Sequence, residues 1–388
     1  MKCVKLKDIA ELIMGQSPPS STYNKASKGY RFLQGKADFG KVNPKARTYC
    51  SSPKKLSIKN DLLISVRAPV GDVNISDQEY CIGRGLAAIR CEDEKLYFKY
   101  LFYFLLKNKD KIISLGTGST FKSINKSILS DIKIPLPPLP TQKKIVEVLD
   151  KAQSLIDARK EQIRLLDELT QSIFYDMFGD PVTNPKGWEI RKLSDVTNRI
   201  TDGVHQKPNY TQDGIPFISV KNISNGTLVF DDCKYISINS HTKYTSRCKP
   251  ERGDILYTKV GARYGVPAIV DNNIEFSIYV SVALLKPKKE YLNSVFLKEM
   301  MKTPYVFRQA IKSIKGIGVP DLHLKEIKNF NVIVPAMAVQ DNYEIQVRRI
   351  HLLKEQVQKS LTECRNYYNC ILKKAFSGDY LWLENEIF

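Results

Sequence analysis

The fold of this chain is decided by two stretches, QKKIVEVLDKAQSLIDARKEQIRLLDELTQSIFYDMF at residues 142–178 and QDNYEIQVRRIHLLKEQVQKSLTECRNYYNCILKKAF at residues 340–376. Each begins with Gln and ends with Phe, and the copies are offset by 198 positions at both ends. Apolar residues recur at alternating intervals of four and three, which predicts a helix with one apolar seam. At 1.5 Å per residue each helix is about 54 Å long. Equal lengths indicate a fixed spacing between the segments that the helices join.

The two seams predict how the helices pack. A homodimeric coiled coil is the weaker alternative, because a partner of the same length is already present in the chain. We therefore expect an intramolecular, antiparallel coiled coil. Thr141 is the expected N-cap of the first helix, and Gly179 and Gly378 are the expected stops. The seam residues are Ile145, Leu149, Ala152, Ile156, Arg159, Ile163, Leu166, Thr170, Ile173 and Met177, then Tyr343, Val347, Ile350, Lys354, Val357, Leu361, Cys364, Tyr368, Ile371 and Ala375.

The segments outside these helices repeat one order of features. Asp61 and Asp254 each precede an apolar run that is typical of a strand. Pro137 and Pro335 each stand five residues before the opening Gln of a helix. The side chains between these markers differ greatly, which is expected if two domains share a fold but bind different targets.

Short runs rich in branched residues predict strands at Asp61–Val66 and Leu86–Ile89, and the aromatic run Tyr97–Leu106 predicts a buried helix. The fold class is therefore α+β, with two mixed α/β domains joined by two long antiparallel helices in a pseudo-two-fold arrangement. The predicted divisions are a first mixed domain at 1–141, a long helix at 142–180, a second mixed domain at 181–339, a long helix at 340–379 and a tail at 380–388.

The net charge of +19 is unevenly distributed. Residues 1–141 carry +12 and residues 181–339 carry +9, whereas residues 142–180 carry −2 and residues 340–388 are neutral. Two basic domains on neutral helices fit a polyanion that is bound at two places. No apolar run is long enough for a membrane span, no signal peptide is expected, and the eight scattered cysteines are expected to be reduced thiols in a cytoplasmic protein.

Motifs for catalysis are absent. Residues 116–123 (GTGSTFKS) resemble a phosphate-binding loop but have Phe121 in place of its second glycine. The tetrapeptides NPPY and DPPY of adenine methylation do not occur, nor do HExxH and GxSxG. Asp61 and Asp254 suggest a nuclease at first sight, but a structural role at the start of a strand is the better interpretation. We expect no catalytic residue and no metal site.

Polar, glycine-rich loops remain as candidate binding segments. Arg and Lys suit guanine and phosphate, and Asn and Gln suit adenine. Similar loops occur at corresponding places in both domains. The candidate DNA-binding residues are Gln16, Ser17, Ser20, Tyr23, Gln34, Lys36, Arg67, Arg84, Thr117, Ser119, Thr120 and Lys122 in the first domain, and Thr201, His205, Gln206, Lys207, Lys221, Asn222, Lys259, Arg263, Tyr264 and Lys315 in the second.

Over its whole length the chain resembles the specificity subunit of type I restriction-modification systems. The resemblance implies two target-recognition domains, each reading one half of a bipartite site in double-stranded DNA, with the helices as spacer. It also implies that the helices dock two methyltransferase subunits and that two restriction subunits complete the complex. S-adenosylmethionine, ATP and Mg²⁺ would then belong to the partners, and this chain would hold no cofactor. The segments that carry the resemblance are MGQSPPSSTYN (14–24), FLQGKADFG (32–40), LLISVRAPVGD (62–72) and CIGRGLAAIR (81–90).

Two alternatives stay open from the residues alone. The chain could be a non-enzymatic adaptor whose basic domains bind acidic protein partners. It could also be an enzyme with an unrecognised nuclease site, for which incubation with DNA and Mg²⁺ is the test.

Overall fold

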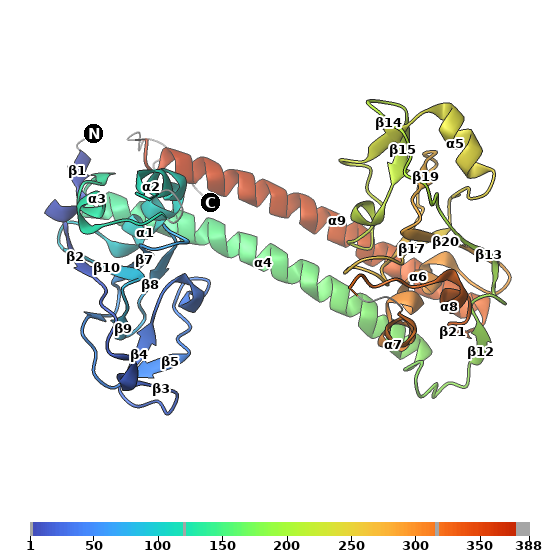
Figure 1. Cartoon of the computed structure of the whole chain (residues 1–388), viewed down its shortest axis with the longest axis horizontal. Helices are drawn as coiled ribbons and strands as arrows, with labels where there is room; N and C mark the ends of the chain where they lie inside the picture. Colours follow the sequence, from blue (N-terminus) through green and yellow to red (C-terminus); the bar gives the residue numbers. More distant parts are fainter. Residues whose placement is uncertain (1–2, 119–121, 315–317, 378–388) are drawn as a thin grey trace. The chain divides into compact units, whose positions relative to one another are not determined.

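The computed structural model describes residues 3–118, 122–314 and 318–377, so Gly378 and the tail lie outside the described residues. The chain divides into two compact units. Unit 1 comprises the residues up to Lys160 and those from Lys359 onward, and unit 2 comprises Glu161–Gln358. Each unit thus combines one globular segment with part of each long helix (Figure 1). Within the described ranges, no helix is both long and apolar enough to cross a bilayer.

The core sheet of unit 1 is antiparallel and has the order β2-β10-β7-β8. A second sheet, β3-β5-β4-β9-β6, is mixed because β4 and β9 run parallel. The strands predicted around residues 61–66 and 86–89 are confirmed as β7 and β10. The bounds are β1 Cys3–Lys5, β2 Ala10–Met14, β3 Tyr23–Asn24, β4 Tyr30–Leu33, β5 Thr48–Cys50, β6 Leu56–Ser57, β7 Leu62–Ser65, β8 Val73–Ile75, β9 Tyr80–Ile82, β10 Leu86–Cys91 and β11 Lys133–Pro135, which pairs with β1.

Helix α1 (Phe98–Lys107) fills the core of unit 1, as the aromatic run predicts. Tyr100, Leu101 and Leu105 are fully buried in the same cluster as β7 and β10 residues. The hydroxyl of Tyr100 donates to the carbonyl of Pro135 at 2.8 Å, so the buried aromatic run leaves this polar atom paired. The other helical elements are α2 Lys109–Leu115, α3 Lys126–Ser130, η1 Leu6–Asp8, η2 Ser20–Thr22 and η3 Lys36–Asp38.

Unit 2 repeats this connectivity. Its core sheet has the order β13-β20-β17-β18, and its second sheet, β14-β16-β15-β19, again contains one parallel pair, β15 with β19. The α+β class with two sheet-rich domains is therefore confirmed, and the repeat extends to strand order. The bounds are β12 Glu189–Lys192, β13 Thr197–Asp202, β14 Tyr210–Thr211, β15 Ile215–Ile218, η4 Val220–Asn222, β16 Lys234–Ile236, α5 Ile238–Thr245, β17 Ile255–Thr258, β18 Pro267–Ile269, β19 Ser277–Ile278, β20 Val282–Pro287, α6 Ser294–Lys302, α7 Pro304–Ser313, α8 Leu324–Lys328 and β21 Asn331–Val334, which pairs with β12.

The long helices are α4 (Leu139–Phe178) and α9 (Met337–Lys374). In unit 1 the start of α4 shares a core with the end of α9, and in unit 2 the end of α4 shares a core with the start of α9. The antiparallel packing within one chain is thus confirmed, and every predicted seam residue is buried or half-buried. Two boundary predictions are wrong. Thr141 is not an N-cap, because the helix already begins at Leu139 and accommodates Pro140 in its first turn. Phe376 lies just beyond the end of α9.

Gln142 and Gln340, the fourth residues of these helices, make the same buried contacts in the two units. The Gln142 Oε1 accepts from the Tyr97 N–H at 2.8 Å, and its Nε2 donates to the carbonyls of Lys95 at 2.9 Å and Pro137 at 2.8 Å. Gln340 repeats this arrangement. It accepts from the Asn293 N–H at 2.9 Å and donates to the carbonyls of Tyr291 at 2.9 Å and Pro335 at 2.7 Å. Each glutamine therefore fixes the start of a long helix to the start of the first core helix of its unit.

Candidate nucleic-acid interface

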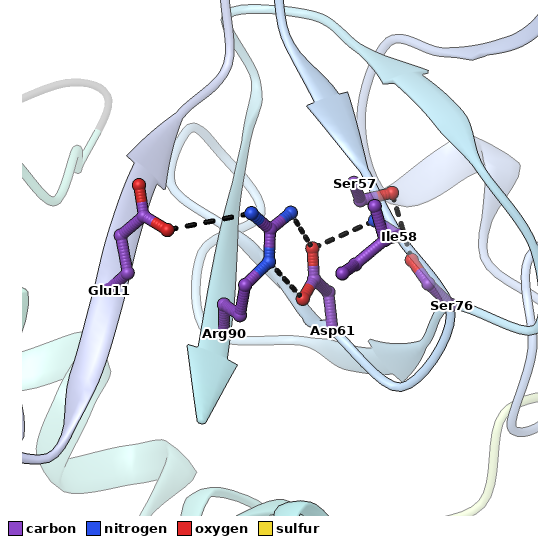
Figure 2. A network of polar contacts seen from close by, with 6 residues as sticks. All are labelled: Glu11, Ser57, Ile58, Asp61, Ser76 and Arg90. Carbon is purple, nitrogen blue, oxygen red and sulfur yellow. Dashed lines mark hydrogen bonds and ion pairs between the residues drawn. The ribbon is translucent and has the colours of Figure 1, made fainter. Parts of the chain in front are cut away.

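Asp61, at the start of β7, is held by a basic side chain rather than exposed for chemistry. Its side chain is 2% exposed. Arg90 donates through Nε to Oδ1 at 3.1 Å and through Nη2 to Oδ2 at 2.9 Å, and the Ile58 N–H donates to Oδ2 at 2.9 Å (Figure 2). Glu11 lies 3.5 Å from Nη1 on the other side of the guanidinium (Figure 2). Beside these contacts, the Ser76 hydroxyl donates to the Ser57 hydroxyl at 2.9 Å (Figure 2).

Asp254 occupies the same place in unit 2. Its Oδ2 accepts from the Glu251 N–H at 2.8 Å and from Lys286 Nζ at 2.6 Å. Burial raises the pKa of the Asp254 carboxyl above its usual range, although the hydrogen bond from Lys286 opposes this. These contacts confirm the structural interpretation of both aspartates. Across the described ranges, no group of three or more His, Cys, Asp or Glu side chains is placed to hold a metal ion.

The loop after β2 lies close to the connection between β9 and β10. A Cβ on Gly15 would lie 2.2 Å from the carbonyl oxygen of Gly83, so only glycine fits there. Next to this close approach of Gly15 and Gly83, the Arg84 N–H donates to the Ser17 Oγ at 3.2 Å. Two loops that are distant in sequence therefore form one continuous surface.

This surface of unit 1 is hollowed into a pocket of about 340 Å³. An adjacent hollow of about 330 Å³ shares Lys36 and Ala68 with it and also contains Asp72, Lys109 and Lys122. Six predicted DNA-binding residues, from four loops and strand β3, come together in the first pocket. Its lining residues are Ser17, Tyr23, Gln34, Gly35, Lys36, Arg67, Ala68, Arg84 and Gly85.

The cations around the pocket differ in their partners. Lys36 and Lys109 contact Asp72 at 2.8 Å and 2.6 Å. Burial favours a higher pKa for Asp72, but hydrogen bonds and charge from the two lysines outweigh it and hold the pKa below its usual range. In contrast, the exposed guanidinium groups of Arg67 and Arg84 make no hydrogen bond or ion pair with any residue in the described parts of the chain. Among the cations that line the first pocket, these two arginines can therefore contact a ligand without breaking an ion pair that the structure shows.

The other predicted residues of unit 1 lie around this pocket or outside the described residues. Gln16 and Ser20 are exposed on the loop after β2, and Lys122 lines the adjacent hollow. Thr117 is exposed and forms a β-bridge with Ser123. Two predicted residues lie outside the described residues: Ser119 and Thr120.

Three predicted residues of unit 2 are less accessible than expected. Thr201 is 8% exposed because it is part of β13, not of the loop that follows. Asn222 is 2% exposed, and its Oδ1 accepts from the Ser219 N–H at 3.1 Å, so its amide stabilises a turn. Lys259 is 6% exposed. Their placement in exposed binding loops is therefore corrected, and none presents its side chain freely to a ligand.

The remaining predicted residues of unit 2 that the structure describes are exposed or half-buried. Lys221 contacts Asp232 at 3.0 Å, and Arg263 donates to the Ser224 Oγ at 3.2 Å. Tyr264 stacks on Phe307 with ring centroids 5.8 Å apart. His205, Gln206 and Lys207 are exposed. Lys315 lies outside the described residues.

An ionic cluster in unit 2, in which the buried side chains of Asp202 and Lys259 contact exposed partners, is not predicted from the sequence. Asp202 accepts from Arg247 at 2.6 Å, contacts His205 at 3.2 Å and lies 3.6 Å from Lys259 Nζ. The same Nζ lies 3.6 Å from Asp321. Because its members come from four separate segments, no local sequence pattern indicates the cluster. Its effect is to fix the loop that carries His205.

The model of the family described as "Type I restriction modification DNA specificity domain" matches residues 1–167 and 185–356. The chain belongs to this family. The two matched stretches each contain one globular segment and the beginning of a long helix, in agreement with the repeat of strand order.

Curated members of this type I specificity family cover most of the chain. The EcoBI specificity subunit of Escherichia coli is 26% identical over 97% of this chain and 85% of its own length. The MjaIX specificity subunit of Methanocaldococcus jannaschii is 24% identical over 97% of this chain and 92% of its own. A candidate MjaX specificity subunit of the same archaeon is 48% identical, but over only 42% of this chain and 38% of its own length.

A solved structure has the same fold. The S subunit of a type I restriction-modification system from M. genitalium superimposes with a TM-score of 0.60 at 16% identity, over 97% of this chain and 96% of that one. Its likeness supports the two-domain, two-helix architecture of the specificity family.

Proposed function

We propose that this chain is the DNA sequence-specificity subunit of a type I restriction-modification complex, in which each unit reads one half of a bipartite site. The observation that carries this is a repeated framework with unlike loops. The glutamine contacts at Gln142 and Gln340 are the same, whereas the matched loops that carry Ser17 in unit 1 and His205 in unit 2 differ in their residues. A framework that is kept while its loops diverge suits two recognition modules for different base sequences.

The proposed functional divisions are those expected from the sequence: recognition modules at 1–141 and 181–339, with spacer helices at 142–180 and 340–379. The +12 and +9 charges of the two modules supply phosphate attraction, and the neutral helices do not compete for it.

The helices also offer docking surfaces for methyltransferase subunits. Leu155 on α4 in unit 1 and Leu353 on α9 in unit 2 are 42% and 51% exposed, and they stand at equivalent positions of the repeat. Apolar side chains outside the seam do not contact the other helix of the coiled coil, so contact with a second protein would explain their exposure. Replacing either leucine by Glu is expected to weaken binding of one methyltransferase subunit and to leave the fold intact. Unchanged binding by both variants would contradict this docking surface.

In this proposal the chain itself is non-catalytic. S-adenosylmethionine, ATP and Mg²⁺ bind to the partners, which are two methyltransferase and two restriction subunits. The purified chain incubated with DNA and Mg²⁺ is expected to leave the DNA intact, and cleavage would overturn the assignment.

The decisive experiment maps methylated sites in a host that expresses this chain with its methyltransferase. Replacement of residues 1–141 by the corresponding segment of another specificity subunit is expected to change one half of the methylated site and to leave the other unchanged. A change in both halves would refute independent modules. Absence of sequence-specific methylation, together with binding to acidic proteins, would favour the adaptor alternative.

A further inference from the structure

Arg84 of unit 1 and Val280 of unit 2 occupy the same position in the repeated framework. Both lie in the connection that leads into the central strand of the core sheet, one residue after a main-chain N–H that donates to the second sheet. Four main-chain hydrogen bonds of unit 1 each have a counterpart in unit 2, and these pairs establish the match. The Gln16 N–H donates to Ile82 O as the Val204 N–H does to Ile278 O, and the Gly83 N–H donates to Leu33 O as the Tyr279 N–H does to Ile218 O. The Leu86 N–H donates to Gly83 O as the Val282 N–H does to Tyr279 O, and the Val66 N–H donates to Gly85 O as the Lys259 N–H does to Ser281 O.

Arg67 and Val260 are matched in the same way. Arg67 follows the end of β7, and Val260 follows the end of the equivalent strand β17. Each forms an isolated antiparallel bridge, Arg67 with Ser123 and Val260 with Asp321. At both positions, unit 1 therefore carries an arginine where unit 2 carries a half-buried valine.

These two substitutions change what the surface can recognise in the major groove. A guanidinium pairs with the O6 and N7 acceptors of guanine, whereas an apolar side chain suits the methyl group of thymine. Because Arg67 and Arg84 line one pocket and have no carboxylate partner in the described chain, both are available for such pairing. The nearby Asp72 is already held by Lys36 and Lys109, so it does not neutralise them.

The backbone of both arginines is fixed before DNA arrives. The Arg84 N–H is bound to Ser17, and Arg67 is held by its bridge to Ser123. Only the side chains need to order on binding, which favours a well-defined contact with a base edge over a diffuse contact with phosphates.

We propose that Arg84 and Arg67 are the guanine-reading residues of unit 1, so that the DNA half-site bound by unit 1 contains guanine. The matched positions of unit 2 carry valine and do not contribute an arginine to base recognition. This inference rests on the proposed function and names the chemistry of its first recognition surface.

The first test maps methylation in cells that contain the methyltransferase and either Arg84→Ala or Arg67→Ala. Each variant is expected to accept other bases at one guanine position of the unit 1 half-site, with a loss of discrimination of about 5- to 100-fold there. The unit 2 half-site is expected to stay unchanged. Both side chains are exposed and make no ion pair with the residues that the structure describes, so the variants are expected to unfold at the wild-type temperature.

Two controls separate base reading from charge. Arg47→Ala removes an exposed arginine of unit 1 that does not line the pocket, and it is expected to preserve the recognised sequence. Val280→Ala is expected to affect the other half-site alone. A unit 1 half-site made only of A·T pairs, or unchanged specificity in both arginine variants, would overturn the inference while leaving a methylated bipartite site, and hence the proposed function, in place. If only one variant relaxes a position, the other arginine is not a reader.

The second test measures binding of the chain with its methyltransferase to duplexes in which 7-deazaguanine replaces each guanine of the half-site. Loss of N7 is expected to weaken binding by the wild type at the position read by Arg84, and to weaken binding by Arg84→Ala no further. Equal weakening of both proteins would show that another group reads the guanine. No binding of any duplex by the wild type would instead refute the proposed function.

Discussion

Replacing Gln142 by Leu tests how the long helix is fixed to unit 1. Leucine is close to glutamine in volume, so the change removes three hydrogen bonds without opening a large cavity. It leaves the Tyr97 N–H and the carbonyls of Lys95 and Pro137 without their partner. At about 1 kcal/mol for each lost bond, the free energy of unfolding of unit 1 is expected to fall by about 3 kcal/mol.

Urea denaturation followed by circular dichroism measures this loss. With a urea dependence of roughly 3 kcal/mol per M for a unit of this size, the unfolding midpoint of unit 1 is expected to move down by about 1 M. Gln340→Leu is expected to produce a comparable shift in unit 2, because its three contacts are the same. Lys143→Ala, at an exposed position of α4 in unit 1, serves as the control and is expected to change stability by less than about 0.5 kcal/mol. If Gln142→Leu unfolds together with that control, the glutamine does not anchor the helix.

Three further changes address the framework around the pocket. Arg90→Met leaves the buried Asp61 carboxylate without its cation and is expected to destabilise unit 1 by about 3 kcal/mol in the same urea assay; an unchanged midpoint would show that water satisfies the carboxylate. The pKa of Asp72 is below its usual 3.8 in the folded chain, so its stabilising contribution is present above that pH and is lost as the pH falls. Asp72→Asn is therefore expected to flatten the acid side of the stability-against-pH curve of unit 1, and an equally steep curve would refute this. Gly15→Ala places a Cβ 2.2 Å from the Gly83 carbonyl and is expected to cost about 2 kcal/mol and to lower binding to the unit 1 half-site, as measured by thermal melting and by affinity for single half-site variants.

The sequence predicts secondary structure well where buried residues recur at a regular spacing along the chain. The seam of α4 and α9 is predictable because residues such as Ile145 and Leu361 recur at helical intervals, and the same residues are buried in the folded chain. The strands at Leu62–Ser65 and Leu86–Cys91 were found from their branched residues for the same reason. The predicted start of α4 is too late, because Pro140 lies in the first turn of the helix, where proline is tolerated.

Loop geometry was only partly predictable, because it depends on contacts between distant segments. Arg67 and Arg84 were named from residue type, yet their position in one pocket follows from strand order, which no local pattern encodes. The polar neighbours of Thr201 resemble a turn and predict a loop, although Thr201 pairs with β20. The residue type of Lys259 predicts exposure, but its side chain is buried against Asp202 of β13, which is distant in sequence.

The cluster around Lys259 also limits how genes for such chains can recombine. In unit 1 the matched position is the core residue Val66, which needs no counter-ion. A crossover between the codons for Asp202 and Lys259 that joins either residue to a segment lacking its partner would leave the buried ammonium of Lys259 with Asp321 alone, or the buried carboxylate of Asp202 without its buried cation. Exchanges that begin and end within the long helices keep this ion pair in one inherited block, so we expect them to disturb the interior least.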